Sequence, residues 1–182
     1  MKLVVDSSAL ALLINPESSP PEDPSTGLTV VKARERIRSY IEGLSSSDTL
    51  IVPTPVLAEL LVKAGNDAPQ LLEQLQRQAR LWVRPFDERA AVELAMMTRE
   101  AVNAGGKRGG SLQPWQKVKF DRQIIAIARV AEATQIYADD KDLGNFARSL
   151  GMDAVSTWDL PIPEEAKNLF TEAGLQPDGT VP

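Results

Sequence analysis

The sequence contains neither cysteine nor histidine among its 182 residues. Without cysteine, the chain forms no disulfides and no thiolate metal sites. The lack of histidine excludes Ser-His-Asp triads, histidine-pair ribonuclease chemistry and nearly every zinc enzyme site. Any hydrolytic chemistry must therefore depend on carboxylates, lysine, hydroxyls or a bound metal ion.

Long apolar runs are also missing, because no segment approaches the roughly 20 apolar residues that span a bilayer. The start, MKLVVDSSALALLI, lacks a small-residue cleavage site and is interrupted by Asp6, so it predicts a buried strand and helix rather than a signal peptide. We therefore expect a cytoplasmic protein without membrane contact. The net charge of −5 argues against a wholly basic nucleic-acid-binding surface but leaves room for a local basic groove.

Apolar segments of strand length alternate with segments of helical periodicity along the chain, and 43% of its residues are hydrophobic. This alternation predicts an α/β domain with a parallel sheet covered by helices on both faces. The predicted strands are 3–5, 49–52, 81–86, 135–138 and 152–155. The predicted helices are 9–14, 30–44, 55–64, 69–80, 88–104, 117–133 and 141–150.

Helix caps and loops complete this prediction. Ser7 and Ser8 are expected to cap the first helix, and Thr29 the second. Residues 15–28 are rich in proline, serine and acid, which predicts a surface loop. Near the end of the chain, residues 163–173 form an amphipathic stretch that predicts a short helix.

Four positions stand out among the 25 acidic residues because of where they fall. In an open parallel α/β sheet, ligands bind at the carboxyl ends of the strands. Asp6 ends the first predicted strand, and Asp139 and Asp140 end the fourth. Glu59 lies early in the helix after the second strand, and Asp121 lies early in the helix that leads into the fourth. If strands one, two and four are neighbours, these acids converge at one edge.

The apolar surroundings of these acids strengthen the argument. Glu59 lies within VLAELL, and Asp121 lies between Phe120 and QIIAIA. Buried carboxylates are unfavourable unless they are paired or coordinate a metal. Capping or a salt bridge would explain any one acid alone, whereas four together favour a metal site. Mg²⁺ and Mn²⁺ prefer carboxylate and water oxygens, so we expect one or two such ions.

Four segments, taken in order, resemble those of PIN-domain nucleases, a family that includes the VapC-type toxins of bacterial toxin–antitoxin pairs. The segments are VVDSSALALL, TPVLAELL, KFDRQIIAIA and IYADDKDLGNFA. The resemblance covers residues 1–156 and implies a five-stranded parallel sheet of order 3-2-1-4-5. It implies an Mg²⁺- or Mn²⁺-dependent endoribonuclease with RNA as substrate and an antitoxin protein as partner. The catalytic and metal-binding residues that it implies are Asp6, Glu59, Asp121 and Asp140.

The sequence departs from the family pattern in places. Ala138 stands where the family often has a hydroxyl residue, and Asp139 and Asp142 compete with Asp140 for the role of fourth acid. Residues 15–28 and 157–182 exceed a minimal domain of this kind, and the latter form a C-terminal extension with the short helix. Supporting roles are expected for Ser7, Ser8, Asp139 and Asp142.

A basic stretch, residues 107–122, is expected to contact RNA. Its cations would contact phosphates, and its tryptophan would stack on a base. The alternative is a solvated loop and helix face with the tryptophan packed inside. The residues concerned are Lys107, Arg108, Trp115, Lys117, Lys119 and Arg122.

Other functions stay open at this point. A catalytically idle PIN-like domain, acting as a protein- or RNA-binding module, would show the same fold without metal-dependent cleavage. A small-molecule phosphatase would favour a D-x-D motif, which Asp6-Ser7-Ser8 lacks, and the acid pattern also fits a flavodoxin-like receiver poorly. The apolar faces of segments 30–44 and 56–64 could serve a homodimer or partner contact, although such faces are more often core.

Overall fold

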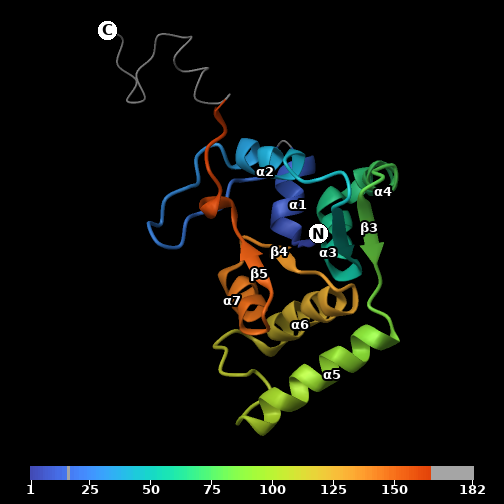
Figure 1. Ribbon diagram of the computed structural model, residues 1–182, viewed down its shortest axis with the longest axis vertical. Helices are drawn as coiled ribbons and strands as arrows, with labels where there is room; N and C mark the ends of the chain where they lie inside the picture. Colours follow the sequence, from blue (N-terminus) through green and yellow to red (C-terminus); the bar gives the residue numbers. More distant parts are fainter. Residues whose placement is uncertain (16, 165–182) are drawn as a thin grey trace.

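The computed structural model describes residues 1–15 and 17–164, which build a five-stranded parallel sheet (Figure 1). Its strands run in the order β3-β2-β1-β4-β5, and each neighbouring pair is parallel. The α/β class and the strand order that we predicted are therefore confirmed. The strands are β1 (Lys2–Val5), β2 (Thr49–Pro53), β3 (Leu81–Arg84), β4 (Gln135–Tyr137) and β5 (Asp153–Val155).

Helices cover the sheet on both sides. Figure 1 shows α1 and α2 on one side of β4 and α6 and α7 on the other, with α5 outside α6. In the described part of the chain, no helix is long and apolar enough to cross a membrane. The α-helices are α1 (Ser7–Ile14), α2 (Ala33–Glu42), α3 (Thr54–Ala64), α4 (Ala68–Gln76), α5 (Glu88–Asn103), α6 (Trp115–Val130) and α7 (Lys141–Ser149). Two short 3₁₀ helices are η1 (Gly65–Asp67) and η2 (Thr157–Asp159).

The central strands are buried on both faces, which explains their continuous apolar sequence. Leu3, Val4 and Val5 follow one another in β1 and are all buried, although successive strand residues point to opposite faces. Ile51 of β2 and Ile136 of β4 are also fully buried beside them. A strand covered by helices on both sides needs apolar residues at every position. The core thus holds the carboxyl ends of β1, β2 and β4 in a fixed relation.

The first helix begins differently from our prediction. Asp6, rather than Ser7 or Ser8, is the N-cap of α1, and its carboxylate accepts a hydrogen bond from the Ser7 backbone N–H. A carboxylate caps a helix as well as a hydroxyl does. The acid at the end of β1 is therefore fixed by the start of the following helix.

The second helix begins later than predicted, at Ala33, after Lys32 in a left-handed conformation with φ 56°. Thr29 does not cap it, because it forms an antiparallel bridge with Glu22. The segment at Glu22 thus folds back on Thr29, a pairing within the loop before α2 that a cap signal does not reveal.

Beyond β5 the chain continues to pack on the domain. The Thr157 side chain in η2 is fully buried, and the backbone carbonyl of Leu160 accepts a 2.6 Å hydrogen bond from Arg36 Nη1. The helix predicted over 163–173 falls almost entirely on residues 165–182, which lie outside the described part of the chain.

Candidate active site

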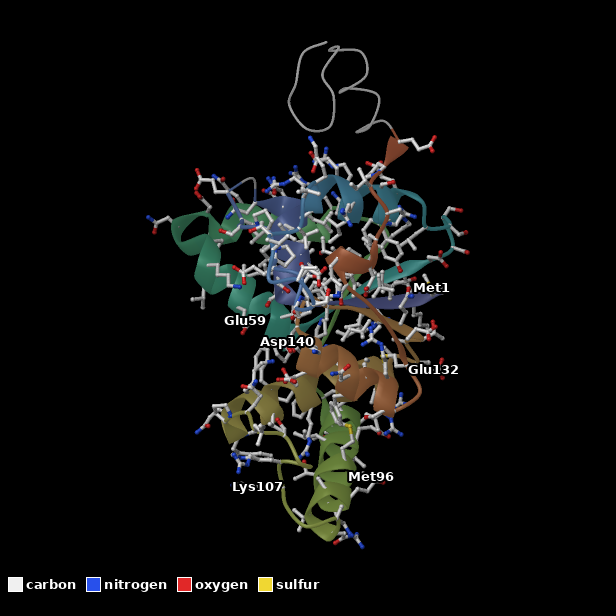
Figure 2. All side chains as sticks on the ribbon, turned by 90° about the vertical axis from the view of Figure 1, so that its left-hand side faces the viewer. Met1, Glu59, Met96, Lys107, Glu132 and Asp140 are labelled. Carbon is white, nitrogen blue, oxygen red and sulfur yellow. The ribbon has the colours of Figure 1, made fainter. Side chains whose placement is uncertain are left out.

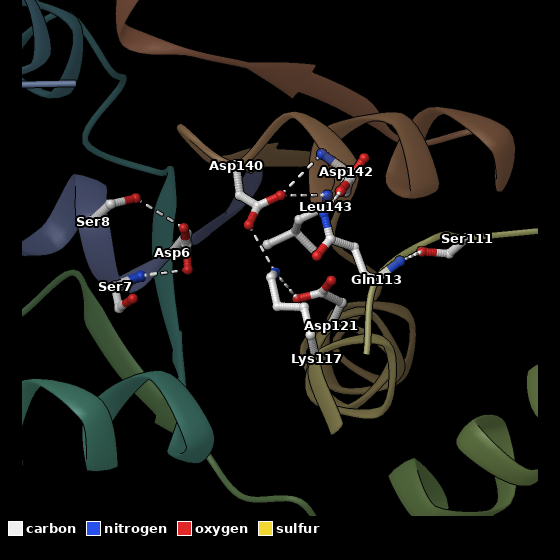
Figure 3. A network of polar contacts seen from close by, with 10 residues as sticks. All are labelled: Asp6, Ser7, Ser8, Ser111, Gln113, Lys117, Asp121, Asp140, Asp142 and Leu143. Atoms are coloured by element: carbon white, nitrogen blue, oxygen red, sulfur yellow. Dashed lines mark hydrogen bonds and ion pairs between the residues drawn. The ribbon is translucent and has the colours of Figure 1, made fainter. Parts of the chain in front are cut away.

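Asp6 lies at the carboxyl end of β1, held from both directions. Its backbone N–H donates to the Tyr137 carbonyl of β4 over 2.9 Å. Its carboxylate accepts from the Ser7 N–H at 2.6 Å and from the Ser8 hydroxyl at 2.9 Å (Figure 3). Burial raises the pKa of Asp6, and the hydrogen bonds from Ser8 and Ser7 lower it only in part. The side chain is therefore oriented but incompletely compensated.

Two further carboxylates share one ammonium group (Figure 3). Lys117 Nζ lies 2.5 Å from Asp121 Oδ1, one turn along α6, and 2.7 Å from Asp140 Oδ2. Asp140 caps α7, where its Oδ1 accepts from the backbone N–H groups of Asp142 at 2.9 Å and Leu143 at 3.0 Å. The start of α6 and the end of β4 thus meet through these side chains.

Charge in this cluster is divided unevenly. Burial raises the pKa of Asp121 to about 6, although the hydrogen bond from Lys117 lowers it. Burial also raises the pKa of Asp140, but the bonds from Lys117 and Leu143 outweigh it, so this pKa is lowered. Burial lowers the pKa of Lys117, but the hydrogen bonds to the two carboxylates raise it by more. The pKa is therefore raised overall, and the ammonium stays charged. The more deeply buried carboxylate, Asp121, carries the larger penalty.

Glu59 completes the set of predicted acids. It lies on α3, which leaves the carboxyl end of β2, and Figure 2 shows it near the middle of the molecule together with Asp140. The negative charges of Asp140 and Glu59 both contribute to raising the pKa of Asp6, and those of Asp140 and Asp6 raise that of Asp121. Asp6, Asp121 and Asp140 therefore lie near one another at one edge of the sheet, and Glu59 lies near Asp6.

The donor atoms of this cluster suit a divalent cation, because Mg²⁺ and Mn²⁺ prefer carboxylate oxygens. Within residues 1–15 and 17–164, however, no three acids are close enough to surround one ion. The Lys117 ammonium instead lies between Asp121 and Asp140, which shows that the place stabilises positive charge. The ligand atoms of these residues thus suit a divalent ion, and in this structure the Lys117 ammonium supplies the positive charge between Asp121 and Asp140.

The other predicted supporting acids have different partners. Asp139 accepts two 2.7 Å hydrogen bonds from the backbone N–H and the hydroxyl of Thr157, so it joins β4 to η2. Asp142 is exposed and accepts a 2.7 Å bond from Gln113 Nε2. Of the three candidates for the fourth acid, only Asp140 contacts Lys117.

The basic stretch 107–122 does not form one continuous surface. Lys107, Arg108 and Lys119 are exposed, whereas Lys117 is held among the acids. Arg122 is only 3% exposed, so it does not lie on the surface that we expected. Trp115 is half-buried, with Lys107 Nζ 4.9 Å and Arg122 Cζ 5.6 Å from its ring centroid.

Sequence reasoning missed the place of Lys117 in the acid site. Its spacing of four residues from Asp121 on a predicted helix is the signal that could have found the pair. The contact with Asp140 depends on packing of α6 against the end of β4, which no local pattern contains.

No family model and no curated protein matches the sequence. Solved structures do match, each over 86% of this chain and 98% of the other. VapBC-1 from nontypeable Haemophilus influenzae has a TM-score of 0.56 at 15% identity. DNA-bound VapBC from Salmonella typhimurium has 0.54 at 18% identity, and VapBC2 from Rickettsia felis, bound to a DNA fragment from the promoter, has 0.52 at 14% identity.

At such identities the likeness concerns the fold, and function must be argued from the site. The chain therefore has the fold of the PIN-domain proteins that its sequence resembles, the fold of these VapBC structures.

Proposed function

We propose that the protein is a divalent-metal-dependent endoribonuclease, a hydrolase of phosphodiester bonds in RNA. One observation supports this proposal: the charges of Asp140 and Glu59 act on Asp6, and those of Asp6 and Asp140 act on Asp121, in a chain without histidine or cysteine. Carboxylates alone cannot neutralise a phosphate, so this site needs added positive charge.

Mg²⁺ or Mn²⁺ would be held directly by Asp6 and Asp140, and Glu59 and Asp121 would bind the ion or orient its waters. When bound, such an ion neutralises charge on the phosphate and lowers the pKa of a water molecule. The chain itself orients the ligands: the Ser8 hydroxyl and Ser7 N–H fix Asp6, and the first turn of α7 fixes Asp140.

Lys117 would change its hydrogen-bond partners when the metal ion and the RNA bind. Its ammonium now bonds to Asp121 and Asp140. A divalent ion competes for the same oxygens, so Lys117 would turn from the carboxylates to a phosphate oxygen of the substrate. The exposed cations Lys107, Arg108 and Lys119 would contact the RNA backbone on either side.

The role of toxin in a toxin–antitoxin pair belongs to the same proposal. The similar structures are of VapBC, and the likeness extends over nearly the whole of their matched chains. An antitoxin protein is therefore the partner that we propose, and its coexpression should restore growth of cells that this protein arrests.

The direct test is RNA cleavage with Mg²⁺, with Mn²⁺ and with EDTA. Asp6→Asn should reduce the rate at least about 100-fold, because removal of one electrostatic contact to the reacting centre typically costs 10²–10³. The matched control is Asp153→Asn, which changes an exposed acid at the start of β5 and should leave the rate unchanged. A folded protein that cleaves no RNA with either ion would favour the idle binding module.

A further inference from the structure

A cavity of about 560 Å³ lies directly beside the acid site. It is bounded by the glycine-rich loop before α6, by α6 itself and by α7, and Asp121 belongs to both the cavity and the acid cluster. Cavities of roughly 300–1,000 Å³ are typical of sites for small molecules, so the space fits a nucleotide. Its lining includes Gly109, Gln113, Asp121, Arg122, Asn145 and Phe146.

Arg122 is the unusual group in this lining. Its side chain is almost completely buried, and its Nη1 donates a 3.2 Å hydrogen bond to the Thr98 hydroxyl. The guanidinium carbon lies 5.6 Å from the Trp115 ring centroid and 6.0 Å from that of Phe146. In the described part of the chain, no carboxylate pairs with Arg122 and its Nε has no hydrogen-bond partner.

A buried guanidinium in this state is not fully compensated. Burial of a charge is unfavourable unless the charge is paired and hydrogen-bonded. Stacking on aromatic rings returns only about 0.5–2 kcal/mol. The unpaired cation therefore favours the entry of an anion into the space that it lines.

The two carboxylates of the same lining do not supply that anion. Asp121 directs its oxygen to Lys117, and Asp142 accepts from Gln113 in an exposed position. Charge repulsion from Asp121 is reduced by Lys117. A negatively charged ligand would thus meet the Arg122 guanidinium, and the exposed Arg108 of the same lining adds a second positive charge.

Close contact between the loop and Arg122 depends on Gly109. A Cβ atom at this position would lie 3.3 Å from Arg122 Nη2, and the backbone has φ +61°, which favours glycine. The loop can therefore lie directly on the guanidinium, and its placement defines one wall of the cavity.

We propose that this cavity binds a phosphate group of the RNA, next to the phosphodiester that is cleaved, with Arg122 as its counter-charge. The proposal rests on the proposed ribonuclease function and adds a substrate subsite to it. Asp121 and Arg122 line the same cavity. An RNA strand with one phosphate at the acid site would therefore place a neighbouring phosphate beside Arg122.

The test compares Arg122→Met with Arg129→Gln, a control on the same helix whose arginine pairs with Glu93 at 3.1 Å. Binding of a 2′-O-methylated RNA oligonucleotide is measured in EDTA, where no cleavage intervenes. Arg122→Met should bind at least about tenfold more weakly, and the slope of log K against log salt should fall by about 0.7, one phosphate contact on a single strand. The control should stay within about twofold of the wild type.

Folding and charge are separated by two further measurements. Arg122→Met should unfold at the same temperature as the wild type or higher, because an unpaired buried charge has been removed. Arg122→Lys, which keeps the charge, should bind with intermediate affinity. Equal RNA affinity in wild type, Arg122→Met and Arg122→Lys would refute the site.

A second arm identifies the source of the phosphate. Inorganic phosphate is titrated into the wild type and Arg122→Met at constant ionic strength. Phosphate binding that needs Arg122, with RNA binding that does not, would overturn the assignment to RNA. Since both arms work without metal, Arg122-dependent RNA binding would still support the subsite if the wild type cleaved nothing, and only the nuclease proposal would then fail.

Discussion

The two edges of the sheet handle charge in opposite ways. At the amino edge, Lys2 pairs with Glu132 over 3.2 Å, and the N-terminal ammonium pairs with Asp48. The Glu132 side chain is largely exposed and that of Lys2 is partly exposed, and each positive group has one negative partner. At the carboxyl edge, buried Asp6 and Asp121 outnumber the cations that contact them. The amino edge thus carries paired charges that are partly exposed, and the carboxyl edge carries buried charge that is not fully compensated.

This difference indicates which edge serves function. Exposed ion pairs change stability little, whereas buried groups of like charge oppose folding until a ligand neutralises them. Groups that strain the folded state tend to persist where they serve a site. The contrast between the edges can be tested by binding a metal ion, by variants that remove charge at the carboxyl edge, and by a variant that removes charge at the amino edge.

Divalent metal should produce the largest effect. Mg²⁺ or Mn²⁺ at 100 times its dissociation constant should raise the free energy of unfolding by about 2.7 kcal/mol, since it binds only the folded state. Thermal unfolding with and without EDTA measures this, with K⁺ at matched ionic strength as control. An identical unfolding temperature in all conditions would contradict a metal site at the carboxyl edge.

Removal of the Asp121 charge should have the next largest effect. The folded pKa of about 6 exceeds the usual 3.8, so between these values the folded protein keeps a proton that the unfolded chain has released. Wild-type stability therefore falls as pH rises through this window and stays reduced above it. In EDTA, Asp121→Asn should be more stable at pH 7.5 by on the order of 2 kcal/mol, and the gain should fade toward pH 4. Urea unfolding across this range measures it, and a gain independent of pH would contradict the charge argument.

Lys117→Met should act in the opposite direction. Without its ammonium, Asp121 and Asp140 lose their shared partner, so the metal-free variant should be about 1–2 kcal/mol less stable. The stabilisation by Mg²⁺ should then exceed that of the wild type, because the competing cation is gone. Calorimetric titration with Mg²⁺ checks the affinity directly. Weaker Mg²⁺ binding in the variant would show that Lys117 supports the ion rather than competes with it.

The smallest effect is expected at the amino edge. Lys2→Met breaks the pair with Glu132, whose carboxylate stays exposed to solvent, so the loss should stay below about 1 kcal/mol. The same urea titration measures it, with Glu132→Gln as the reciprocal change. A loss above 2 kcal/mol would remove the distinction between the two edges.

Local sequence patterns predicted the elements well where packing only reinforces them. The apolar β1 and the helix predicted over 88–104 follow from neighbouring residues, and both are present, the helix as α5. The strand order rested on the resemblance, because nothing within one element records its neighbour. The edge at which Asp6, Glu59 and Asp121 meet then followed from sheet geometry.

Contacts outside the helical and strand periodicity account for what was missed. Thr29 carries a good cap signal, yet its bridge with Glu22 removes it from α2. In the sequence, Arg122 resembles the other basic residues around it. Its burial comes from α5 and α7, which place Thr98 and Phe146 beside it. Sequence can identify a charge, but its burial depends on elements that arrive from elsewhere in the chain.

One side chain, Asp6, both begins α1 and belongs to the acid cluster, and this double use offers an experimental separation. Asparagine caps helices as well as aspartate does, and its amide oxygen can accept the same bond from the Ser7 N–H. Asp6→Asn therefore removes the charge but keeps the helix cap, whereas Asp6→Ala removes both the charge and the cap. The difference in unfolding free energy between these two variants measures what the cap contributes to stability. The cleavage assay measures separately what the proposed catalytic role of Asp6 contributes to the rate.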